Sequence, residues 1–423
     1  MGNLTGKEVA QMHKDYVMQS WSKSGVDALP VEKAKGIYFW DYDGKKYADM
    51  ASLLVCSNLG HELPEIVEAI KEQADKMCFM APAYASEPKS KLAKMLVEAA
   101  GADHFKRVFF TNGGAESNEN AIKMARMVTG RTKVFSCYRS YHGATLGASN
   151  ASGDWRRFAA EIGGANGFVK FMNPQMYRDG YTYGVDDEAV TKKALADLDL
   201  QLRYEGPQNV AAILMESIVG ANGVILPPKG YMEGVRKLCD EKGILLILDE
   251  IQCGMGRTGS MFAYQQYGVK PDIVTVAKAL GCGVPVGAFA AKDEVAKALV
   301  PGDHGTTYGR NPLACAAAVK VFELFDSLKV LDNVKEVGAY LASELDKIVA
   351  EYDIATERRG MGLIQGLQLS VNPKDVIANA LDNGLILFSA GTNVIRFVPP
   401  LVITKADVDE MIVRLKKSLD SCR

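Results

Sequence analysis

Two side chains of opposite charge occur where charge is unfavourable, at the ends of apolar runs. Asp249 follows residues 243–248, which carry no charge, and Lys278 lies in the mostly apolar stretch 273–280. Such runs are typical of strands buried on both faces of a parallel sheet, whose carboxyl ends hold ligands. Burial disfavours a charged lysine, so we expect Lys278 to be neutral or covalently used. An acid and a lysine placed in this way fit pyridoxal phosphate: the lysine forms a Schiff base, and the acid keeps the pyridine nitrogen protonated.

A glycine turn upstream could bind the phosphate of such a cofactor. Gly113, Gly114 and Ala115 lie between a predicted strand at 108–110 and a predicted helix. Free backbone N–H groups and the helix dipole attract anions at a turn of this kind. A plain strand-to-helix turn explains the same residues equally well, so the turn alone does not decide the matter.

A tyrosine and a histidine follow the next predicted strand, around Phe135. Tyr141 and His142 belong to the segment 138–143. An aromatic side chain at a strand end could stack on the planar ring of a cofactor. A tyrosine that simply packs in a loop is the alternative, and it is the more frequent case. Both residues are therefore candidates for contact with the cofactor.

Glu216 and Arg396 are charged residues within apolar segments and could form a pair. Glu216 ends the uncharged run 210–215, where a carboxylate needs a partner, and Arg396 lies between apolar neighbours. The planar guanidinium of arginine is suited to bidentate binding of a carboxylate. A capping carboxylate and a structural ion pair are the alternatives that involve no substrate.

The composition is ordinary for an enzyme and excludes several classes of protein. The chain has 423 residues, 48% hydrophobic and 24% charged, with a formal net charge of -2. Because the chain has no strong run of positive or of negative residues, we expect neither nucleic acid nor membrane as a partner. Eight scattered cysteines form no CxxC pair, and five histidines show no metal-ligand spacing, so we expect a reduced protein without a bound metal. The chain lacks an apolar signal region at its start and any uncharged apolar run of about 18 residues, which predicts a cytoplasmic location.

Apolar strands alternate with helical patterns from residue 107 to about residue 290. This alternation predicts an α/β fold with a mainly parallel sheet covered by helices. The predicted strands are residues 108–110, 134–135, 168–172, 210–215, 243–248, 271–276 and 286–290.

Outside this region the pattern changes, which indicates a second, smaller domain. Asp43-Gly44 between alternating aromatic residues predicts a hairpin, and two long helical patterns cover about 312–327 and 330–350. We assign residues 61–310 to a large cofactor-binding domain, and residues 1–60 with 311–423 to a smaller α+β domain.

The order of these residues resembles that of the class III (ω-amino acid) aminotransferases of pyridoxal phosphate fold type I. This group includes ornithine, acetylornithine, 4-aminobutyrate, β-alanine and taurine transaminases, and the chain is most similar in kind to the last two. The resemblance extends from residue 36 to residue 401. Three motifs carry it: LDEIQCGMGRTG at 248–259, PDIVTVAK at 271–278 and HGTTYGRNP at 304–312.

The resemblance implies how the ring of the cofactor is held. Lys278 is implied to be the Schiff-base lysine and the base that moves a proton between Cα of the substrate and C4′ of the cofactor. Asp249 is implied to bond the pyridine nitrogen, and Gln252 the phenolic oxygen. Tyr141 and Ile251 are implied to lie against opposite faces of the ring.

The resemblance also implies how the phosphate and the substrates are bound. The phosphate is bound by the turn at 113–115 and by Thr307 of the neighbouring subunit, so a homodimer or a tetramer with shared sites is implied. Arg396 either binds the carboxylate of a substrate or is neutralised by Glu216. Such a switch lets one pocket accept an amine donor and an α-oxo acid, either 2-oxoglutarate or pyruvate.

Departures from the family pattern bear on the amine donor. Gly113 stands where many relatives have Ser or Thr, so backbone groups must bind the phosphate there. Ala144 stands where relatives that bind an additional carboxylate often have Arg, which weakens an acetylornithine, ornithine or 4-aminobutyrate assignment. We expect Trp21 and Arg156 to line a pocket for taurine or β-alanine, although a solvated basic loop explains Arg156 as well.

Two other classes of protein share part of this pattern. An aminomutase of the glutamate-1-semialdehyde type, or an amino-group-dependent lyase, has most of these residues, because fold and cofactor motifs do not fix the reaction. A regulatory module that senses pyridoxal phosphate without catalysis needs an appended DNA-binding segment. The chain has neither spare length nor a basic helix for one.

Overall fold

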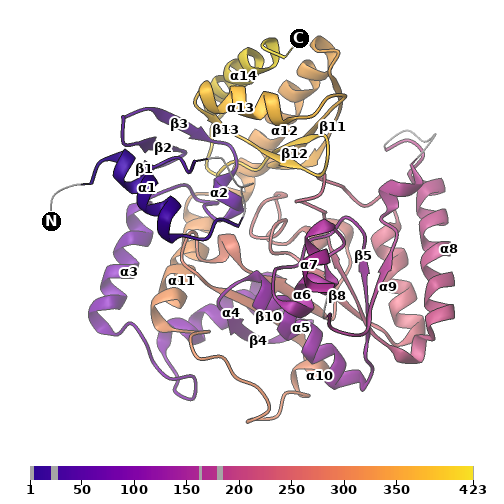
Figure 1. Ribbon diagram of the computed structural model, residues 1–423. Coiled ribbons are helices and arrows are strands. Elements are labelled where there is room, and N and C mark those ends of the chain that lie inside the picture. The colour runs from indigo at the N-terminus through magenta and orange to yellow at the C-terminus, as the bar shows by residue number, and fades with distance from the viewer. Residues whose placement is uncertain (1–3, 21–26, 162–163, 179–183, 423) are drawn as a thin grey trace.

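The computed structural model describes residues 4–20, 27–161, 164–178 and 184–422, and its centre is a seven-stranded sheet (Figure 1). The five strands from β9 to β6 are parallel, whereas β10 is antiparallel to both of its neighbours. In spatial order the strands are β4 (Phe105–Thr111), β10 (Gly287–Lys292), β9 (Ile273–Val276), β8 (Leu245–Asp249), β7 (Val210–Glu216), β5 (Lys133–Cys137) and β6 (Phe168–Phe171).

The predicted α/β fold with a mainly parallel sheet is confirmed, and the reversal of β10 has a simple cause. Only residues 277–286 connect β9 to β10. A parallel crossover needs a connection of about a dozen residues or more, usually with a helix, so the chain turns back instead. Lys278 lies in this short connection, two residues after the end of β9.

The central strands are uninterrupted apolar runs because helices cover both faces of the sheet. Leu246 and Leu248 of β8 belong to the core that also contains side chains of α8 (Asp187–Glu205) and α9 (Tyr231–Lys242). Leu245 and Ile247 belong to a second core, formed with α5 (Gly114–Thr129). Since alternate residues of a strand point to opposite faces, the positions of β8 from Leu245 to Leu248 are all apolar, and only its last residue, Asp249, is charged.

Two smaller sheets lie outside the central one, and the first of them contains strands from both ends of the chain. The first has the order β1 (Val31–Lys35), β2 (Tyr38–Asp41), β3 (Lys46–Asp49) and β13 (Leu385–Ile386), and β2 and β3 form the hairpin predicted around Asp43-Gly44. Because β13 pairs with β3, the N-terminal and C-terminal parts fold side by side (Figure 1). The boundaries of the two domains remain a prediction.

The second small sheet is antiparallel and carries Arg396. Its order is β11 (Ala355–Met361), β12 (Ile364–Leu369), β15 (Val394–Phe397) and β14 (Phe388–Ala390). The remaining helices are α1 (Gly6–Tyr16), α2 (Ser52–Val55), α3 (Pro64–Lys76), α4 (Glu87–Gly101), α6 (Leu146–Ala151), α7 (Phe158–Glu161), α10 (Asp293–Ala296), α11 (Pro312–Ser327), α12 (Val330–Glu351), α13 (Lys374–Asp382) and α14 (Lys405–Asp420). Among the described helices, none has the length and apolar composition that crossing a bilayer requires.

The short element α2 is a left-handed turn. The φ angles of Ser52, Leu53, Leu54 and Val55 are 45°, 36°, 67° and 66°, a region that costs roughly 1–2 kcal/mol per residue. Hydrogen bonds hold the turn in place: the Ser52 hydroxyl donates to the carbonyl oxygen of Val398 over 2.7 Å, and the backbone N–H of Leu53 donates to Asp49.

Candidate active site

The carboxyl ends of β7, β8 and β9 bring two carboxylates and a lysine to one edge of the central sheet. Glu216 of β7 is aligned with Asp249 of β8, and Asp249 is aligned with Thr275 of β9. Lys278 follows β9 after one intervening residue. The structure therefore places together the acid and the lysine that the apolar runs predicted for a cofactor.

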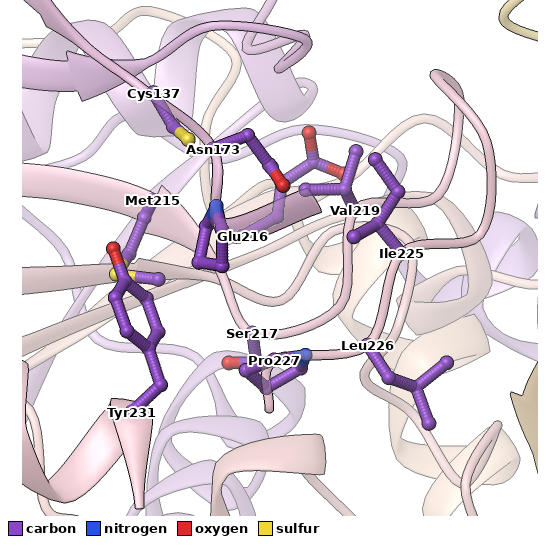
Figure 2. A pocket seen from close by; sticks show the side chains of 11 residues that line it. Cys137, Asn173, Met215, Glu216, Ser217, Val219, Ile225, Leu226, Pro227 and Tyr231 are labelled. Carbon is purple, nitrogen blue, oxygen red and sulfur yellow. The ribbon is translucent and has the colours of Figure 1, made fainter. Parts of the chain in front are cut away.

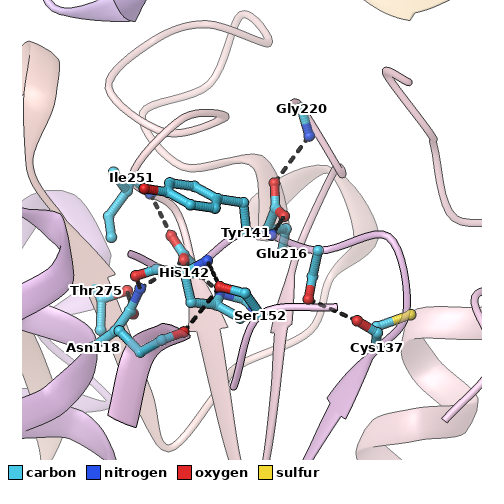
Figure 3. A network of polar contacts seen from close by, with 12 residues as sticks. Asn118, Cys137, Tyr141, His142, Ser152, Glu216, Gly220, Ile251 and Thr275 are labelled. Carbon is cyan, nitrogen blue, oxygen red and sulfur yellow. Dashed lines mark hydrogen bonds and ion pairs between the residues drawn. The ribbon is translucent and has the colours of Figure 1, made fainter. Parts of the chain in front are cut away.

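The Asp249 carboxylate is buried and is held by three donors (Figure 3). Its Oδ2 accepts hydrogen bonds from Asn118 Nδ2 and from His142 Nδ1, each over 2.8 Å, and its Oδ1 accepts from the backbone N–H of Ile251 over 3.0 Å. Because an ionised carboxylate only accepts hydrogen bonds, His142 carries its proton on Nδ1. The orientation of the carboxylate is therefore fixed from three directions.

The donors of Asp249 are themselves held. Asn118 Oδ1 accepts a hydrogen bond from the Thr275 hydroxyl over 2.8 Å, and the backbone N–H of His142 donates to Ser152 Oγ over 2.9 Å. Sequence reasoning missed Asn118 and Ser152. A polar residue in the first turns of α5 was the only signal for Asn118, and nothing in the sequence indicated Ser152.

Lys278 has an amine without a partner. Among the described residues, its Nζ makes no hydrogen bond and no ion pair. Burial lowers the pKa of the Lys278 amine, and the nearby charge of Asp249 opposes part of that effect. A lysine whose pKa is lowered in this way is a better nucleophile and base near neutral pH.

The glycine turn leaves open space in front of the N-terminus of α5. Gly113 caps the helix in an extended conformation, and nothing lies within 4 Å of the position that a Cβ atom of Gly113 would occupy. At Gly114 a Cβ atom would come within 2.9 Å of the Ile251 side chain. The turn therefore combines room for an anion with free N–H groups, and Gly114 lets Ile251 lie close to it.

These residues fit pyridoxal phosphate. The unpartnered amine, the fixed carboxylate and the open helix N-terminus are the three groups that the cofactor requires for its aldehyde carbon, its pyridine nitrogen and its phosphate. The individual roles of Lys278, Asp249 and the turn at 113–115 remain proposals.

Tyr141 and Arg156 contact each other next to Glu216, one of the two carboxylates of the site. The backbone N–H of Tyr141 donates to Glu216 over 3.0 Å, and the Arg156 guanidinium lies 3.8 Å from the centre of the Tyr141 ring. Arg156 Nε also donates to Asp154 over 2.9 Å. Arg156 also lines the same cleft as Arg396, and its predicted role in binding substrate remains a proposal.

Glu216 and Arg396 do not form the expected ion pair in this structure. The Glu216 carboxylate accepts from the backbone N–H groups of Tyr141 and Gly220, whereas Arg396 Nη1 donates to Gln252 Oε1 over 2.7 Å. Among the described residues no salt bridge joins Glu216 to Arg396. Gln252 thus contacts Arg396 through its oxygen, which leaves its amide nitrogen for the predicted bond to the phenolic oxygen.

Glu216 is shielded from water. Its pKa is raised to about 7, mainly by burial and also by the neighbouring Asp249, while the backbone N–H groups of Gly220 and Tyr141 oppose the rise. On one side Glu216 borders a small cavity of about 20 Å³, next to Met215 and Tyr231 (Figure 2). A volume of that size holds about one water molecule.

An open cleft of about 810 Å³ leads to Arg396 and Arg156 and includes Leu54 in its wall. Thr307 lies outside this cleft and is exposed, while its neighbour Thr306 donates to Glu116 of α5 over 3.0 Å. Trp21, the other predicted pocket residue, lies outside the described residues.

The assignment of Lys278 predicts the behaviour of Lys278→Ala. We expect the variant to bind the cofactor without a covalent bond and to lose about 10²- to 10⁴-fold in turnover, because the positioned base is absent. Borohydride reduction followed by mass spectrometry measures the bond. Lys170→Ala is the control, because burial lowers the pKa of Lys170 as well, to about 8, although its amine is bonded to Ser136. Covalent cofactor on the Lys278→Ala chain would contradict the assignment.

The raised pKa of Glu216 predicts a pH dependence of stability. A carboxyl group whose pKa rises from 4.5 to about 7 on folding stabilises the fold below pH 4.5, and this contribution is lost as the pH rises to about 7. As the pH rises from 4.5 to about 7, the free energy of unfolding should therefore fall by about 3 kcal/mol less in Glu216→Gln than in the wild type. Urea denaturation at both ends of the window measures the difference, and equal losses in the two proteins would refute the shift.

Comparisons with known proteins show which family the chain belongs to. Residues 21–419 match the family model "Aminotransferase class-III". The acetylornithine aminotransferase of Methanocaldococcus jannaschii is 40% identical over 410 residues, 95% of each chain.

The solved structures that resemble this chain are also aminotransferases. The taurine:2-oxoglutarate aminotransferase of Bifidobacterium kashiwanohense, solved with pyridoxal phosphate and glutamate, is 56% identical with a TM-score of 0.96, over 100% of this chain and 99% of that one. An (S)-enantioselective ω-transaminase of Thermomicrobium roseum is 31% identical with a TM-score of 0.92, over 99% of each chain. The chain belongs to the class III aminotransferases, enzymes that depend on pyridoxal phosphate.

Proposed function

We propose that the enzyme transfers the amino group of a short ω-amino acid, taurine or β-alanine, to 2-oxoglutarate. The observation that carries the proposal is the pair of guanidiniums, Arg156 and Arg396, in the wall of one cleft. The 56% identity to a protein named for taurine and 2-oxoglutarate supports these substrates. Ala144 supports a donor without an additional carboxylate, because the residue directly after Gly143 has no guanidinium.

Acetylornithine is the second candidate donor. The acetylornithine aminotransferases of M. jannaschii and Clostridium acetobutylicum are 40% and 36% identical over almost the whole chain. The lower identity and Ala144 place this candidate second.

The proposed chemistry needs one proton to be moved and two acid groups to be held. Pyridoxal phosphate, when bound, supplies an electron sink for the carbon that loses the proton. The Lys278 amine takes that proton and returns it, while Asp249 stays fixed by His142 and Asn118. Arg396 binds the carboxylate of the oxo acid in place of Gln252, and Arg156 binds the acid group of the donor.

Arg156 is suited to a donor with one acid group at a short distance. Its guanidinium is fixed by Asp154 and by the Tyr141 ring, so little side-chain entropy is lost when an anion binds. Because Asp154 neutralises part of its charge, Arg156 favours a singly charged sulfonate or carboxylate.

The donor assignment predicts selective effects of Arg156→Ala. We expect kcat/KM to fall roughly 10- to 100-fold for taurine and β-alanine, which lose a charge-assisted hydrogen bond, and to change little for an uncharged amine. Steady-state kinetics with 2-oxoglutarate measures all three donors. Arg157→Ala is the matched control, because Arg157 is adjacent in the chain and bonded to Glu161. Equal losses for all three donors would exclude this role of Arg156.

We also propose that the enzyme is a cytoplasmic homodimer in which Thr307 contacts the phosphate in the other subunit. The exposure of Thr307, next to the anchored Thr306, supports this arrangement. Sedimentation equilibrium should give twice the mass of one chain, and Thr307→Ala should weaken cofactor binding without changing that mass. A monomer that is fully active would contradict the proposal.

A further inference from the structure

The exposed Thr307 belongs to a tip, residues 305–309, that is attached to the rest of the protein at both ends. Thr307 and Tyr308 are exposed, whereas Gly309 is buried. A Cβ atom on Gly309 would lie 2.5 Å from the carbonyl oxygen of Phe110, so the chain returns to the end of β4 directly after the exposed residues. The other end of the tip follows a histidine that the proposed reaction has not used.

That histidine is His304, and it is held by Lys123 of α5. Lys123 Nζ lies 2.9 Å from His304 Nδ1 and donates to the carbonyl oxygen of Asp303 over 3.2 Å. Because the ammonium of an exposed lysine only donates hydrogen bonds, His304 Nδ1 accepts, and the proton of the ring lies on Nε2. His304 therefore makes this bond only as the neutral ring with a free lone pair on Nδ1.

No other polar contact holds the imidazole of His304. The ring packs against Phe109 of β4 with 5.0 Å between the ring centres, and the Arg310 guanidinium lies 5.0 Å from the centre of the same Phe109 ring. His304 Nε2 is buried and has no hydrogen-bond partner among the described residues. Within the part of the chain that the structure describes, Lys123 is thus the only polar anchor of the ring.

The charges around the imidazole favour its neutral form. Burial lowers the pKa of His304, and the charges of Lys123 and Arg310 lower it further, while Glu116 of α5 opposes them. In an imidazolium, an N–H on Nδ1 points at the Lys123 ammonium, so a repulsion between two cations replaces the bond. The attachment of the tip is therefore fully stable above the ordinary histidine pKa of 6.5 and loses stability as the pH falls below it.

A second attachment links the tip to the beginning of the same helix. The Thr306 hydroxyl donates to Glu116 over 3.0 Å, and the backbone N–H of Gly309 donates to the Thr306 hydroxyl over 3.3 Å. Glu116 lies in the first turn of α5, directly after the glycine turn at 113–115, and Lys123 lies about two turns further along. Because both attachments are on α5, they fix the position of Thr307 relative to the helix.

We propose that His304 is a positioning residue for the cofactor phosphate: its neutral ring accepts the bond from Lys123 that holds Thr307 in place for the neighbouring subunit, and protonation of the ring releases the tip. This inference rests on the proposed role of Thr307 and adds what controls it. Cofactor affinity then depends on the protonation of a residue that is not among the described residues lining the cleft.

The test is the dissociation constant of pyridoxal phosphate from the full-length protein, measured by spectrophotometric titration at about pH 8 and about pH 5.5, on either side of the ordinary histidine pKa. His304→Ala should weaken binding roughly 10-fold at the higher pH, as expected for a lost charge-assisted hydrogen bond. His304→Asn should bind like the wild type there, because its side-chain oxygen takes the place of Nδ1.

The pH dependence separates a titrating anchor from a merely structural one. Lowering the pH should weaken binding roughly 10-fold more in the wild type than in His304→Asn, because an amide does not titrate. The phosphate of the cofactor titrates in the same range in every variant, so the difference between the two proteins isolates the imidazole. Lys123→Gln should also lose this difference, since an amide donates to the neutral ring and accepts from the protonated one.

His104 provides the matched control. It packs against Phe105 and donates from Nε2 to the carbonyl oxygen of Pro271 over 2.8 Å. A bond to a carbonyl oxygen survives protonation of the ring, so His104→Asn should keep the pH dependence of the wild type. Thermal denaturation of each variant checks that it is folded.

Amide hydrogen exchange of residues 305–309 in the holoenzyme follows the tip itself and separates this inference from the proposed role of Thr307. Exchange should be faster in His304→Ala than in His304→Asn. Equal exchange in these two variants, or a pH dependence of affinity that persists in His304→Asn, would overturn the inference. If Thr307→Ala leaves cofactor affinity unchanged while His304→Ala still speeds exchange, His304 holds the tip and only the role of Thr307 is rejected.

Discussion

The fixed orientation of one buried carboxylate determines the geometry of the site. Asp249 ends a strand that is covered on both faces, so its charge cannot be solvated by bulk water and must be held by protein donors. Asn118 from α5 and His142 from the segment after β5 provide them. The carboxylate therefore ties a helix and a loop to the strand, and it does so beside the amine of Lys278.

Charge in the rest of the site is distributed around that carboxylate. Glu216 lies beside Asp249 in the sheet, and burial together with the nearby Asp249 raises its pKa to about 7, against the opposing effect of the backbone N–H groups of Gly220 and Tyr141. Arg396, in turn, is held by the uncharged amide of Gln252. Because this bond involves no opposite charge, the substrate carboxylate proposed to bind Arg396 would displace Gln252 without first breaking an ion pair.

The sequence predicted those features that depend on short runs of residues. An apolar run that ends in Asp249 or Glu216 indicates a buried strand with an acid at its end, and a glycine turn before a helix indicates an anion site. Contacts between distant segments could not be predicted in this way. Asn118 meets Asp249, and Lys123 meets His304, only because of strand register and loop paths that no local pattern encodes. Gln252 was expected at the cofactor, and its bond to Arg396 depends on the same long-range geometry.

The left-handed turn α2 gives one wall of the cleft an unusual property. Leu54 lines the cleft from a backbone conformation that few residues tolerate and that occupies a narrow region of φ and ψ. Anchors on Asp49 and Val398 keep the turn from relaxing. The position of Leu54 in the wall of the cleft is thus set by the main chain, so this part of the wall cannot move aside unless the backbone of residues 52–55 changes its conformation.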